Sequence, residues 1–331
     1  MSFKNIIILH GGNEEAEISD VSADYIMNKI DLISLDGKKI KPCLINLKNY
    51  SNEIELLNFL NENYPPIETY VIPCVHGHPG ESGTLPLLLN MYNYKYLGSD
   101  FQSSFICFNK ISTKLWCEKI GIPTTPFILM SENNYLEDKK KEEALEFFEE
   151  CNREIFVKTP TQGSSIGCYF VNDKNKLTDE IKKSFKFNNQ VILEKKVNAR
   201  ELEVAVFTYN DELICTEPGE VLTEGKFYDF ARKYSKESKI ETITNTTIEL
   251  YLKTKIQKYC QLIFKQLGLK DLSRIDFFVD KTDGSLYLNE INTFPGMTPI
   301  SMFPKMMEEH GIKFQDYILS KLNMGNQHEK N

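Results

Sequence analysis

Four polar residues near the carboxyl end of the chain are of types that can bind a cation. Arg274, Asp276, Glu290 and Asn292 lie in residues 272–298, LSRIDFFVDKTDGSLYLNEINTFPGMT, a segment that is otherwise mostly apolar and β-prone. Charged and amide groups are costly to bury unless they are paired. Hard divalent cations such as Mg²⁺ prefer carboxylate and carbonyl oxygens and usually bind together with substrate phosphates. A Mg²⁺–nucleotide site is therefore the favoured interpretation of this segment.

A buried ion pair is the simpler alternative, in which Arg274 neutralises Asp276 or Glu290. Such a pair would leave one carboxylate without a partner and would not require Asn292, so it explains less of the pattern. Calcium is a weaker candidate than magnesium, because the chain has no dense acidic loop of the EF-hand kind.

A β-hairpin would hold these four side chains together. Two β-prone runs are joined by DKTDG, and its Asp-Gly pair is a strong turn signal. Side chains alternate between the two faces of a strand. Arg274 and Asp276 are therefore expected on one face of the first strand, and Glu290 and Asn292 on one face of the second.

If the cation carries a nucleotide, phosphate-binding groups are expected elsewhere, and FVKTPTQGSSIG offers them. Lys158 ends an expected strand, and the loop 163–167 that follows is rich in backbone N–H and hydroxyl donors. A Gly/Ser loop between two strands is commonly only a turn. Its position directly after a strand lysine favours a phosphate-binding loop.

The first hundred residues alternate short apolar strands with helices, which predicts a parallel sheet with helices on both faces. Ligand sites in such sheets lie beyond the carboxyl ends of the strands, where HGG (10–12) and HGHPGESG (76–83) are expected. Neither stretch is a standard nucleotide fingerprint. In the first helix, four apolar residues are expected near one face: Ile18, Val21, Ile26 and Ile30.

The rest of the chain reads as two α+β units. One helix is expected from Ser103 to Gly121, with a proline just beyond it. A charged helix at 137–152 is expected to present a solvated face and to bury a few apolar residues. A long helix at 248–268 precedes the hairpin, and two helices follow it. The fold class is thus α/β for the first unit and α+β for the others.

The totals are those of a multi-domain globular protein without a membrane span. With 331 residues the chain exceeds the usual size of a single core. Its net charge of -8 weakly disfavours nucleic acid as a partner. No apolar run approaches the roughly 20 residues that span a bilayer, and the amino terminus does not resemble a signal peptide. Eight cysteines without a C-x-x-C pair fit buried thiols in a reducing cytoplasm.

Five segments, in order, resemble the ATP-grasp ligases and, among them, the D-alanine–D-alanine ligase family. GGNEEAEIS resembles the family's G-G-x-x-x-E-x-E-V-S, and HGHPGESGTL resembles H-G-x-x-G-E-D-G-T. FVKTPTQGSSIG resembles V-K-P-x-x-x-G-S-S-x-G, and FYDFARKYS resembles a mobile loop F-Y-D-Y-x-x-K-Y. RIDFF…LNEINTFPGMTPIS resembles R-I-D…E-x-N-T-x-P-G-M-T…S. The resemblance covers nearly the whole chain.

The resemblance implies an ATP-grasp fold with an N-terminal doubly wound α/β domain (1–104), a central subdomain (105–198) and a C-terminal subdomain with the metal site (199–331). It implies that ATP phosphorylates the carboxylate of one D-alanine and that the amine of a second attacks the acyl phosphate. The product, D-alanyl-D-alanine, would serve peptidoglycan and cell-wall synthesis. The cofactors would be ATP and two Mg²⁺ ions, with Mn²⁺ as a substitute, in a cytoplasmic homodimer without nucleic-acid or membrane partners.

Site residues follow from the matching motifs. The metal ligands would be Asp276, Glu290 and Asn292. The residues implied in catalysis and loop closure are Glu15, Ser164, Tyr234, Arg274 and Gly296. The residues implied near the amino-acid substrates are His76, Glu81 and Ser301. The residues implied around the nucleotide are Lys110, Lys158, Ser165, Glu194, Lys195, Val197, Glu201 and Lys233.

Each of these residues also has an ordinary structural interpretation. Glu15 could simply be an acid favoured at a helix start, and His76 a hydrogen-bonded structural histidine. Lys110 on a helix would usually be a surface residue, and Glu194 and Glu201 could be solvated charges at strand edges. The order in which the motifs recur favours the functional interpretation.

Several positions depart from the family pattern, and they bear on substrate detail. They are Ser82, Pro86, Phe230 and Phe294. A ligase that joins D-alanine to D-lactate, D-serine or another amino acid is therefore the alternative, although Lys233-Tyr234 favours D-alanine as acceptor. A non-catalytic nucleotide-binding module and a NAD-dependent oxidoreductase are the other classes considered. The loop 223–238 is expected to close over the phosphates, and the tail from Met324 to be disordered.

Overall fold

The computed structural model describes residues 3–13, 15–31, 34–35, 38–39, 41–135, 137–163, 166–222 and 241–324. The expected mobile loop at 223–238 and the tail after Met324 lie outside these residues. Four predicted site residues lie outside them as well: Ser164, Ser165, Lys233 and Tyr234.

The first sheet is parallel, as predicted, with strand order β4-β1-β5-β6. Its strands are β1 (Asn5–His10), β4 (Cys43–Asn46), β5 (Thr69–Pro73) and β6 (Lys95–Tyr96), and its helices are α1 (Ala16–Ile30), α2 (Glu53–Asn63) and α3 (Thr84–Met91). Ile6 and Ile8 of β1 join a core with α1, whereas Ile7 and Leu9 join a core with α2 and α3. Both faces of the sheet are therefore covered, which explains why β1 is continuously apolar.

The buried face of α1 agrees with the prediction at Ile26 and Ile30 but differs at Val21. Val21 is 48% exposed, and the buried stripe contains Ser19, Ser22, Ala23, Ile26 and Ile30. Small hydroxyl residues occupy this stripe because their Oγ atoms accept backbone N–H groups from other segments. A prediction from apolar residues alone therefore shifted the buried face toward Val21 and away from Ser19 and Ser22.

The second sheet is antiparallel, with strand order β7-β10-β8-β9. Its elements are β7 (Phe127–Ser131), α6 (Glu132–Tyr135), α7 (Asp138–Glu150), β8 (Ile155–Lys158), β9 (Cys168–Val171), α8 (Lys174–Phe185) and β10 (Gln190–Lys195). The charged helix α7 buries Ala144, Phe147 and Phe148 and exposes most of its charges, as expected. The loop between β8 and β9 is the predicted Gly/Ser loop.

The single helix expected from Ser103 to Gly121 is two helices, α4 (Phe101–Phe108) and α5 (Lys110–Lys119). Asn109 separates them with an extended backbone, and its side chain accepts the N–H groups of Ile111 and Ser112. Asparagine favours such a cap because its side chain competes with helical backbone hydrogen bonds. Lys110 consequently stands at the start of a helix, where its N–H donates to the carbonyl of Pro160 at 2.9 Å.

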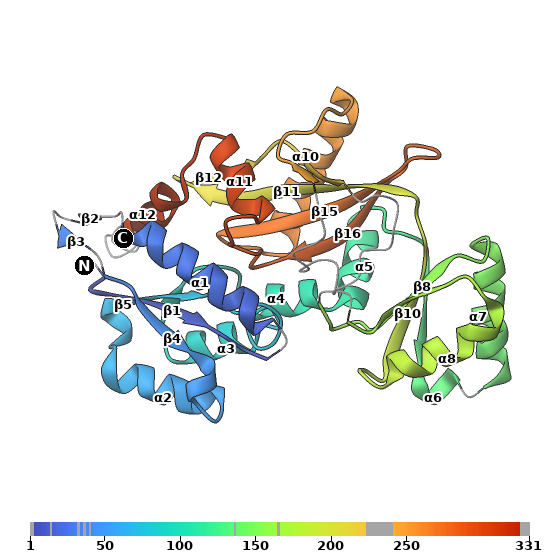
Figure 1. Cartoon of the computed structure of the whole chain (residues 1–331), viewed down its shortest axis with the longest axis horizontal. Helices are drawn as coiled ribbons and strands as arrows, with labels where there is room; N and C mark the ends of the chain where they lie inside the picture. Colours follow the sequence, from blue (N-terminus) through green and yellow to red (C-terminus); the bar gives the residue numbers. More distant parts are fainter. Residues whose placement is uncertain are drawn as a thin grey trace.

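The third sheet is antiparallel and contains the predicted hairpin, with order β14-β13-β11-β15-β16 and β12 paired to β11. Its elements are β11 (Ala199–Tyr209), β12 (Glu212–Cys215), β13 (Gly219–Leu222), β14 (Glu241–Ile243), α10 (Leu250–Gln266), β15 (Leu272–Asp280) and β16 (Leu286–Asn292). The long helix α10 packs on one face through Ile256, Cys260 and Ile263. In Figure 1 this sheet lies between the first sheet and the second.

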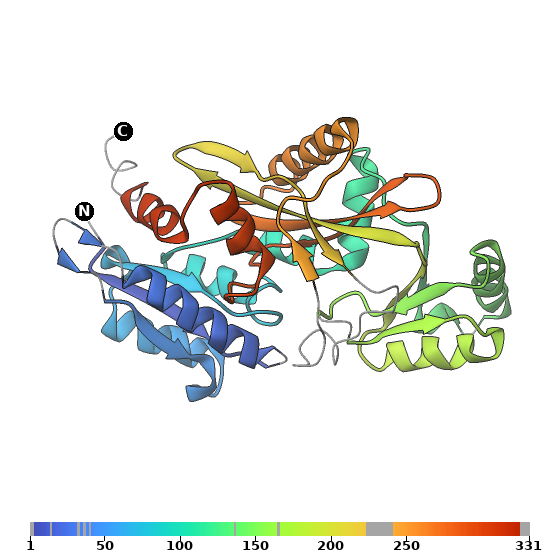
Figure 2. The ribbon, with the colours of Figure 1, turned by 45° about the horizontal axis from the view of Figure 1, so that its top comes forward.

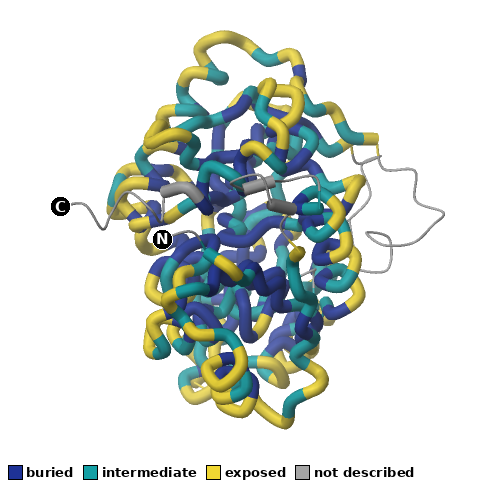
Figure 3. The backbone as a smooth tube through the Cα atoms, turned by 90° about the vertical axis from the view of Figure 1, so that its left-hand side faces the viewer, coloured by how far each residue is buried: buried dark blue, intermediate teal, exposed yellow. Residues whose placement is uncertain are grey.

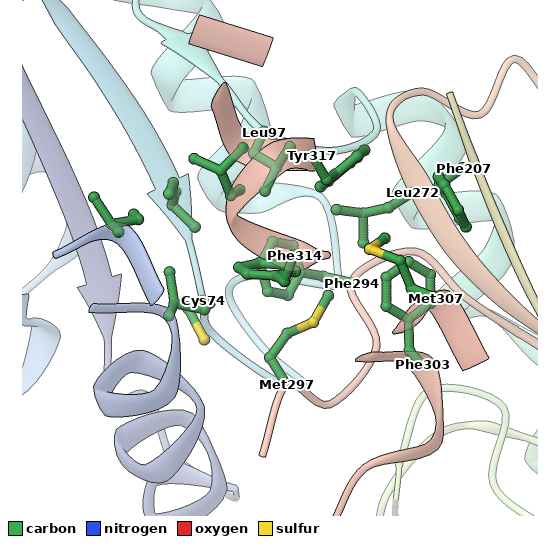
Figure 4. Packing of buried hydrophobic residues seen from close by; sticks show 14 of the residues in the cluster. Cys74, Leu97, Phe207, Leu272, Phe294, Met297, Phe303, Met307, Phe314 and Tyr317 are labelled. Atoms are coloured by element: carbon green, nitrogen blue, oxygen red, sulfur yellow. The ribbon is translucent and has the colours of Figure 1, made fainter. Parts of the chain in front are cut away.

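The last two helices, α11 (Met302–Glu309) and α12 (Phe314–Met324), pack between the third sheet and the N-terminal unit. Figure 2 shows them above α1. Figure 4 shows Phe303, Phe314 and Tyr317 of these helices in one cluster with Cys74 and with the third-sheet residue Phe207. This shared core fixes the amino-terminal sheet against the sheet that carries the hairpin.

Minor elements among the described residues are the 3₁₀ turns Leu47–Asn49 and Pro66–Glu68 and the two short strands β2 (Ser34–Leu35) and β3 (Lys38–Lys39). Figure 3 shows that the buried residues lie in the interior and the exposed residues at the periphery. All eight cysteines are free thiols. Within the described ranges, no helix has the length and apolar character needed to cross a membrane.

Candidate active site

The hairpin gathers its four polar residues on one face, as predicted. Arg274 pairs with Asn292 across the two strands, and Asp276 pairs with Glu290. The Arg274 guanidinium binds Asp276 through two hydrogen bonds of 2.8 and 2.7 Å. The Asn292 side chain donates to the Oδ2 atom of Asp276 at 3.1 Å.

Glu203 belongs to the same cluster and was missed by sequence analysis. It lies on β11 directly opposite Asp276, and its Oε2 atom is 3.2 Å from the Nε atom of Arg274. Burial alone would lower the pKa of Arg274, but Asp276 and Glu203 outweigh it and raise that pKa well above its usual value. The alternating acids in RELEV were the signal that could have found Glu203, because a strand places every second residue on one face.

The ion-pair alternative is therefore correct for Arg274 and Asp276, but it does not account for the whole cluster. Two further acids lie next to this pair, because Glu203 on β11 and Glu290 on β16 are both register partners of Asp276. The amide nitrogen of Asn292 is directed at Asp276, which leaves its carbonyl oxygen as a donor atom for a cation. Two carboxylates and a carbonyl oxygen suit Mg²⁺.

Protein side chains alone do not complete a metal cage here. In the part of the chain that the structure describes, no group of three or more His, Cys, Asp or Glu side chains is arranged to hold a metal. Mg²⁺ usually keeps several ligands from water and substrate phosphate. The donor set of Asp276, Glu290 and Asn292 therefore fits a magnesium ion that is bound jointly with a nucleotide.

Lys158 and Glu194 form a buried ion pair beside the Gly/Ser loop. The Nζ atom of Lys158 lies 2.8 Å from Oε1 of Glu194, and Lys114 lies 3.2 Å from Oε2. Burial would raise the pKa of Glu194, but Lys158 and Lys114 lower it to about 2. Glu194 is only 4% exposed, so it is not a solvated strand-edge charge.

Lys110 also faces this loop and is half-buried. Its Nζ atom donates to the carbonyl oxygen of Gln162 at 2.6 Å. Burial lowers the pKa of Lys110, and the charge of Glu290 opposes that shift. Glu290 acts on Lys158 in the same direction. The lysines and the hairpin acid thus share one electrostatic environment.

The Gly/Ser loop also meets the amino-terminal unit. A Cβ atom at Gly163 would lie 3.5 Å from the Oε2 atom of Glu15, and one at Gly77 would lie 3.9 Å from it. Glu81 accepts the N–H of Gly77 at 2.9 Å. Burial, with the charge of Glu15 as the next cause, raises the pKa of Glu81 to about 8. Glu15 of the amino-terminal unit therefore lies beside the loop, and Glu81 lies close to Glu15.

His76 is buried between α1 and the loop after β16. Its Nε2 atom is 3.2 Å from Oγ of Ser22, and its ring lies 6.3 Å, centroid to centroid, from that of Phe294. Burial lowers the pKa of His76 to about 4, so the imidazole is neutral at pH 7. The departure at Phe294 from the family pattern thus supplies an aromatic wall against His76.

Gly296 and Ser301 lie together in the loop between β16 and α11. A Cβ atom at Gly296 would be 3.0 Å from Oγ of Ser301. That Oγ accepts the N–H of Thr298 at 3.1 Å. The next residue in the loop, Met297, donates its N–H to Ser22 of α1 at 3.2 Å. The loop is thereby anchored on α1 through Ser22, the residue that His76 also contacts.

The remaining predicted nucleotide residues that the structure describes lie where β10 passes into β11. Lys195 ends β10, with its N–H bonded to the carbonyl of Pro126, and Val197 follows it half-buried. Glu201 is near the start of β11, between Val221 and Phe278 of the neighbouring strands. The structure thus brings Lys110, Lys158 and Glu194 to the loop and places Lys195 at the end of β10, Val197 in the connection to β11 and Glu201 near the start of β11.

An α/β domain and two antiparallel sheets that bring together a lysine-bearing loop and an acidic hairpin define the ATP-grasp class of ligases. Known structures agree. The D-alanyl-alanine synthetase A of Vibrio cholerae matches with a TM-score of 0.86 and 36% identity, over 98% of this chain and 99% of that one. The VanG D-Ala:D-Ser ligase of Enterococcus faecalis matches with a TM-score of 0.78 and 27% identity, over 98% of this chain and 99% of that one.

Sequence comparison narrows the class. Residues 116–322 match the family model described as D-ala D-ala ligase C-terminus. The D-alanine–D-alanine ligase of Tolumonas auensis is 40% identical, covering 95% of this chain and 96% of its own. The D-alanine–D-alanine ligase of Shewanella woodyi is 39% identical, covering 97% of this chain and 98% of its own. The chain belongs to the D-alanine–D-alanine ligase family.

Proposed function

We propose that this chain uses ATP to join two D-alanines into D-alanyl-D-alanine for peptidoglycan precursor synthesis. The single observation that carries the proposal is the meeting of two sets of groups. Helix α5, which begins at Lys110, packs against β16, which carries Glu290, and the charge of Glu290 opposes the effect of burial on the pKa of Lys110. This packing supports a single site for the acidic hairpin and the Gly/Ser loop. That combination suits a Mg²⁺–nucleotide complex better than a dinucleotide cofactor.

The reaction needs ATP because a carboxylate is a poor electrophile. Phosphorylation of the first D-alanine gives an acyl phosphate, and the amine of the second D-alanine attacks its carbonyl carbon with loss of phosphate. Lys110 and Lys158 bind the nucleotide phosphates. Arg274, held by Asp276 and Glu203, is oriented to stabilise the oxyanion of the tetrahedral intermediate, with a backbone N–H near Gly296 as a second donor.

Asp276, Glu290 and Asn292 would hold Mg²⁺. Two ions are proposed, with Mn²⁺ as a substitute. When bound, magnesium neutralises phosphate charge and polarises the transferred phosphoryl group. The nucleotide base and ribose are assigned to Glu194, Lys195, Val197 and Glu201 on the β10–β11 side. Ser165 and Lys233, both outside the described residues, complete the phosphate set in this proposal.

The amino acids are assigned to the amino-terminal side. Glu15 binds the ammonium of the first D-alanine, with neutral His76 and Glu81 beside it. Ser301 binds the carboxylate of the second. Ser164 and Tyr234, outside the described residues, are proposed to link Glu15 to the closed loop. The proposed organisation is three units, 1–104, 105–198 and 199–331, in a cytoplasmic homodimer.

A coupled assay of ADP release tests the proposal. ADP formation that requires both D-alanine and Mg²⁺, with D-alanyl-D-alanine identified as the product, is the expected result. ATP binding without D-alanine-dependent ADP release would instead indicate a non-catalytic nucleotide-binding module.

Acceptor choice is tested in the same assay with D-alanine as donor and D-lactate, D-serine or D-alanine as acceptor. We expect D-alanine to react fastest, because Tyr234 is retained. Faster turnover with D-serine or D-lactate would reject that assignment.

A further inference from the structure

A third lysine, Lys114, lies beside Glu194 together with Lys158, and the proposed function gives it no contact with the nucleotide. Lys114 is 4% exposed and belongs to α5, one turn after Lys110. Its Nζ atom donates to Oγ1 of Thr125 at 2.9 Å and to the carbonyl oxygen of Thr125 at 3.2 Å. It also lies 4.9 Å from the centre of the Phe127 ring. Lys114 is thus fixed by the segment that leads into β7.

Glu194 is shared between two lysines on its two oxygens. Oε1 binds Lys158 at 2.8 Å, and Oε2 lies 3.2 Å from Lys114. Both lysines and the carboxylate are largely buried, with side-chain exposures of 14%, 5% and 5% for Lys158, Lys114 and Glu194. One negative charge therefore serves two positive charges, and the trio carries a net positive charge.

We propose that Lys114 is a positioning residue that keeps Glu194 neutralised while Lys158 leaves it to bind a nucleotide phosphate. The inference rests on the proposed nucleotide function. A buried carboxylate that loses its only cation is strongly destabilised. Without Lys114, Lys158 could reach a phosphate only by leaving Glu194 in that state. With Lys114 in place, Glu194 keeps a partner on Oε2 and Lys158 is available.

The inference predicts an effect that depends on phosphate. In Lys114→Met, the dissociation constants of ATP and ADP should rise by about tenfold or more, because Lys158 stays paired with Glu194. Binding of adenosine, which lacks phosphate, should stay within about twofold, because Lys158 remains on Oε1 of Glu194 and holds that side chain in place. Lys119→Met, an exposed lysine on the same helix, is the matched control and should change neither ligand.

A double variant separates positioning from simple structural support. In a Glu194→Gln background the carboxylate that holds Lys158 is gone, so Lys114→Met should change ATP affinity by no more than about threefold. This comparison also replaces the single variant if Lys114→Met alone does not fold, since the double variant has no buried carboxylate at position 194 that needs a cation.

Isothermal titration of ATP, ADP and adenosine into each variant measures these dissociation constants. Equal loss of adenosine and ATP binding in Lys114→Met would assign Lys114 a structural role and overturn the inference. An unchanged ATP affinity in that variant, or a tenfold loss that persists in the Glu194→Gln background, would also overturn it. Failure of the wild type to release ADP with D-alanine would instead count against the proposed function alone.

Discussion

Arg274 and Asp276, two residues apart on β15, are joined by two parallel hydrogen bonds of 2.8 and 2.7 Å. A two-bonded arginine–carboxylate pair fixes the plane of the guanidinium as well as its position. The same carboxylate is a proposed magnesium ligand, so the arginine and the metal share Asp276. Metal binding and orientation of the proposed oxyanion-stabilising group are consequently coupled through one side chain.

Removing the arginine should expose this coupling. Arg274→Met leaves the carboxylates of Asp276 and Glu203 without their cation, so the free energy of unfolding should fall by about 3–5 kcal/mol. Mg²⁺ should restore part of the loss, and turnover should be abolished. Chemical denaturation with and without Mg²⁺ measures the effect. A smaller stabilisation by Mg²⁺ in the variant than in the wild type would contradict a shared metal site.

Glu290→Gln tests the metal ligation directly. The substitution keeps the shape of the side chain but removes its charge, so turnover should fall on the order of 100-fold and the Mg²⁺ requirement should shift to higher concentration. ADP release measured against Mg²⁺ concentration reports both changes. Glu212→Gln, at an exposed glutamate on β12, is the control and should behave as the wild type. An unaltered Mg²⁺ titration in Glu290→Gln would reject Glu290 as a ligand.

Ser301 should govern the acceptor D-alanine without affecting ATP. Ser301→Ala removes a hydroxyl proposed to bind the acceptor carboxylate. In this variant the KM for the acceptor D-alanine should rise by about 10- to 100-fold. Gly296→Ala should give a similar defect, because its new Cβ would stand 3.0 Å from the Ser301 Oγ. In the double variant the two effects should fall short of additivity, since the crowded atom is absent. Steady-state kinetics with each substrate varied separately measure these effects, and a matching rise in the KM for ATP would argue against this assignment.

Glu81 should make stability depend on pH. Its pKa is raised from 4.5 to about 8 in the folded protein, so between those values the folded state holds a proton that the unfolded chain has released. The free energy of unfolding should therefore fall as pH rises from 5 to 8, by at most about 1.4 kcal/mol per pH unit, and level off above 8. Glu81→Gln lacks this ionisation. Denaturation of both proteins at pH 5 to 9 gives the difference, and parallel curves would show that Glu81 titrates normally.

His76 should act in the opposite sense at acid pH. Because burial lowers its pKa from 6.5 to about 4, the unfolded chain binds a proton in that interval that the folded protein excludes. The contribution of the neutral imidazole is complete above 6.5 and is lost as pH falls, by about 3 kcal/mol at pH 4. His76→Asn should reduce this pH dependence between pH 4 and 7 in chemical denaturation. The same slope in the variant would assign the acid sensitivity to other groups.

The hairpin shows how far local rules reach. Alternation along two strands and one Asp-Gly turn were enough to place Arg274, Asp276, Glu290 and Asn292 on one face. Strand–helix alternation likewise predicted the parallel first sheet. The helix break at Asn109 was missed because the apolar periodicity continues through it. The break depends on a single residue, Asn109, whose side chain caps the start of α5.

The sequence by itself determined which residues can carry the chemistry and which secondary elements hold them, because residue type and spacing along a strand are local properties. Only the tertiary structure decided the partners. Glu203 reaches Arg274 from a neighbouring strand, Lys114 reaches Glu194 from a helix, and Glu81 lies beside Glu15 from a separate loop. Charge balance and pKa depend on such distances between segments remote in the chain, and these are set when the three sheets pack together.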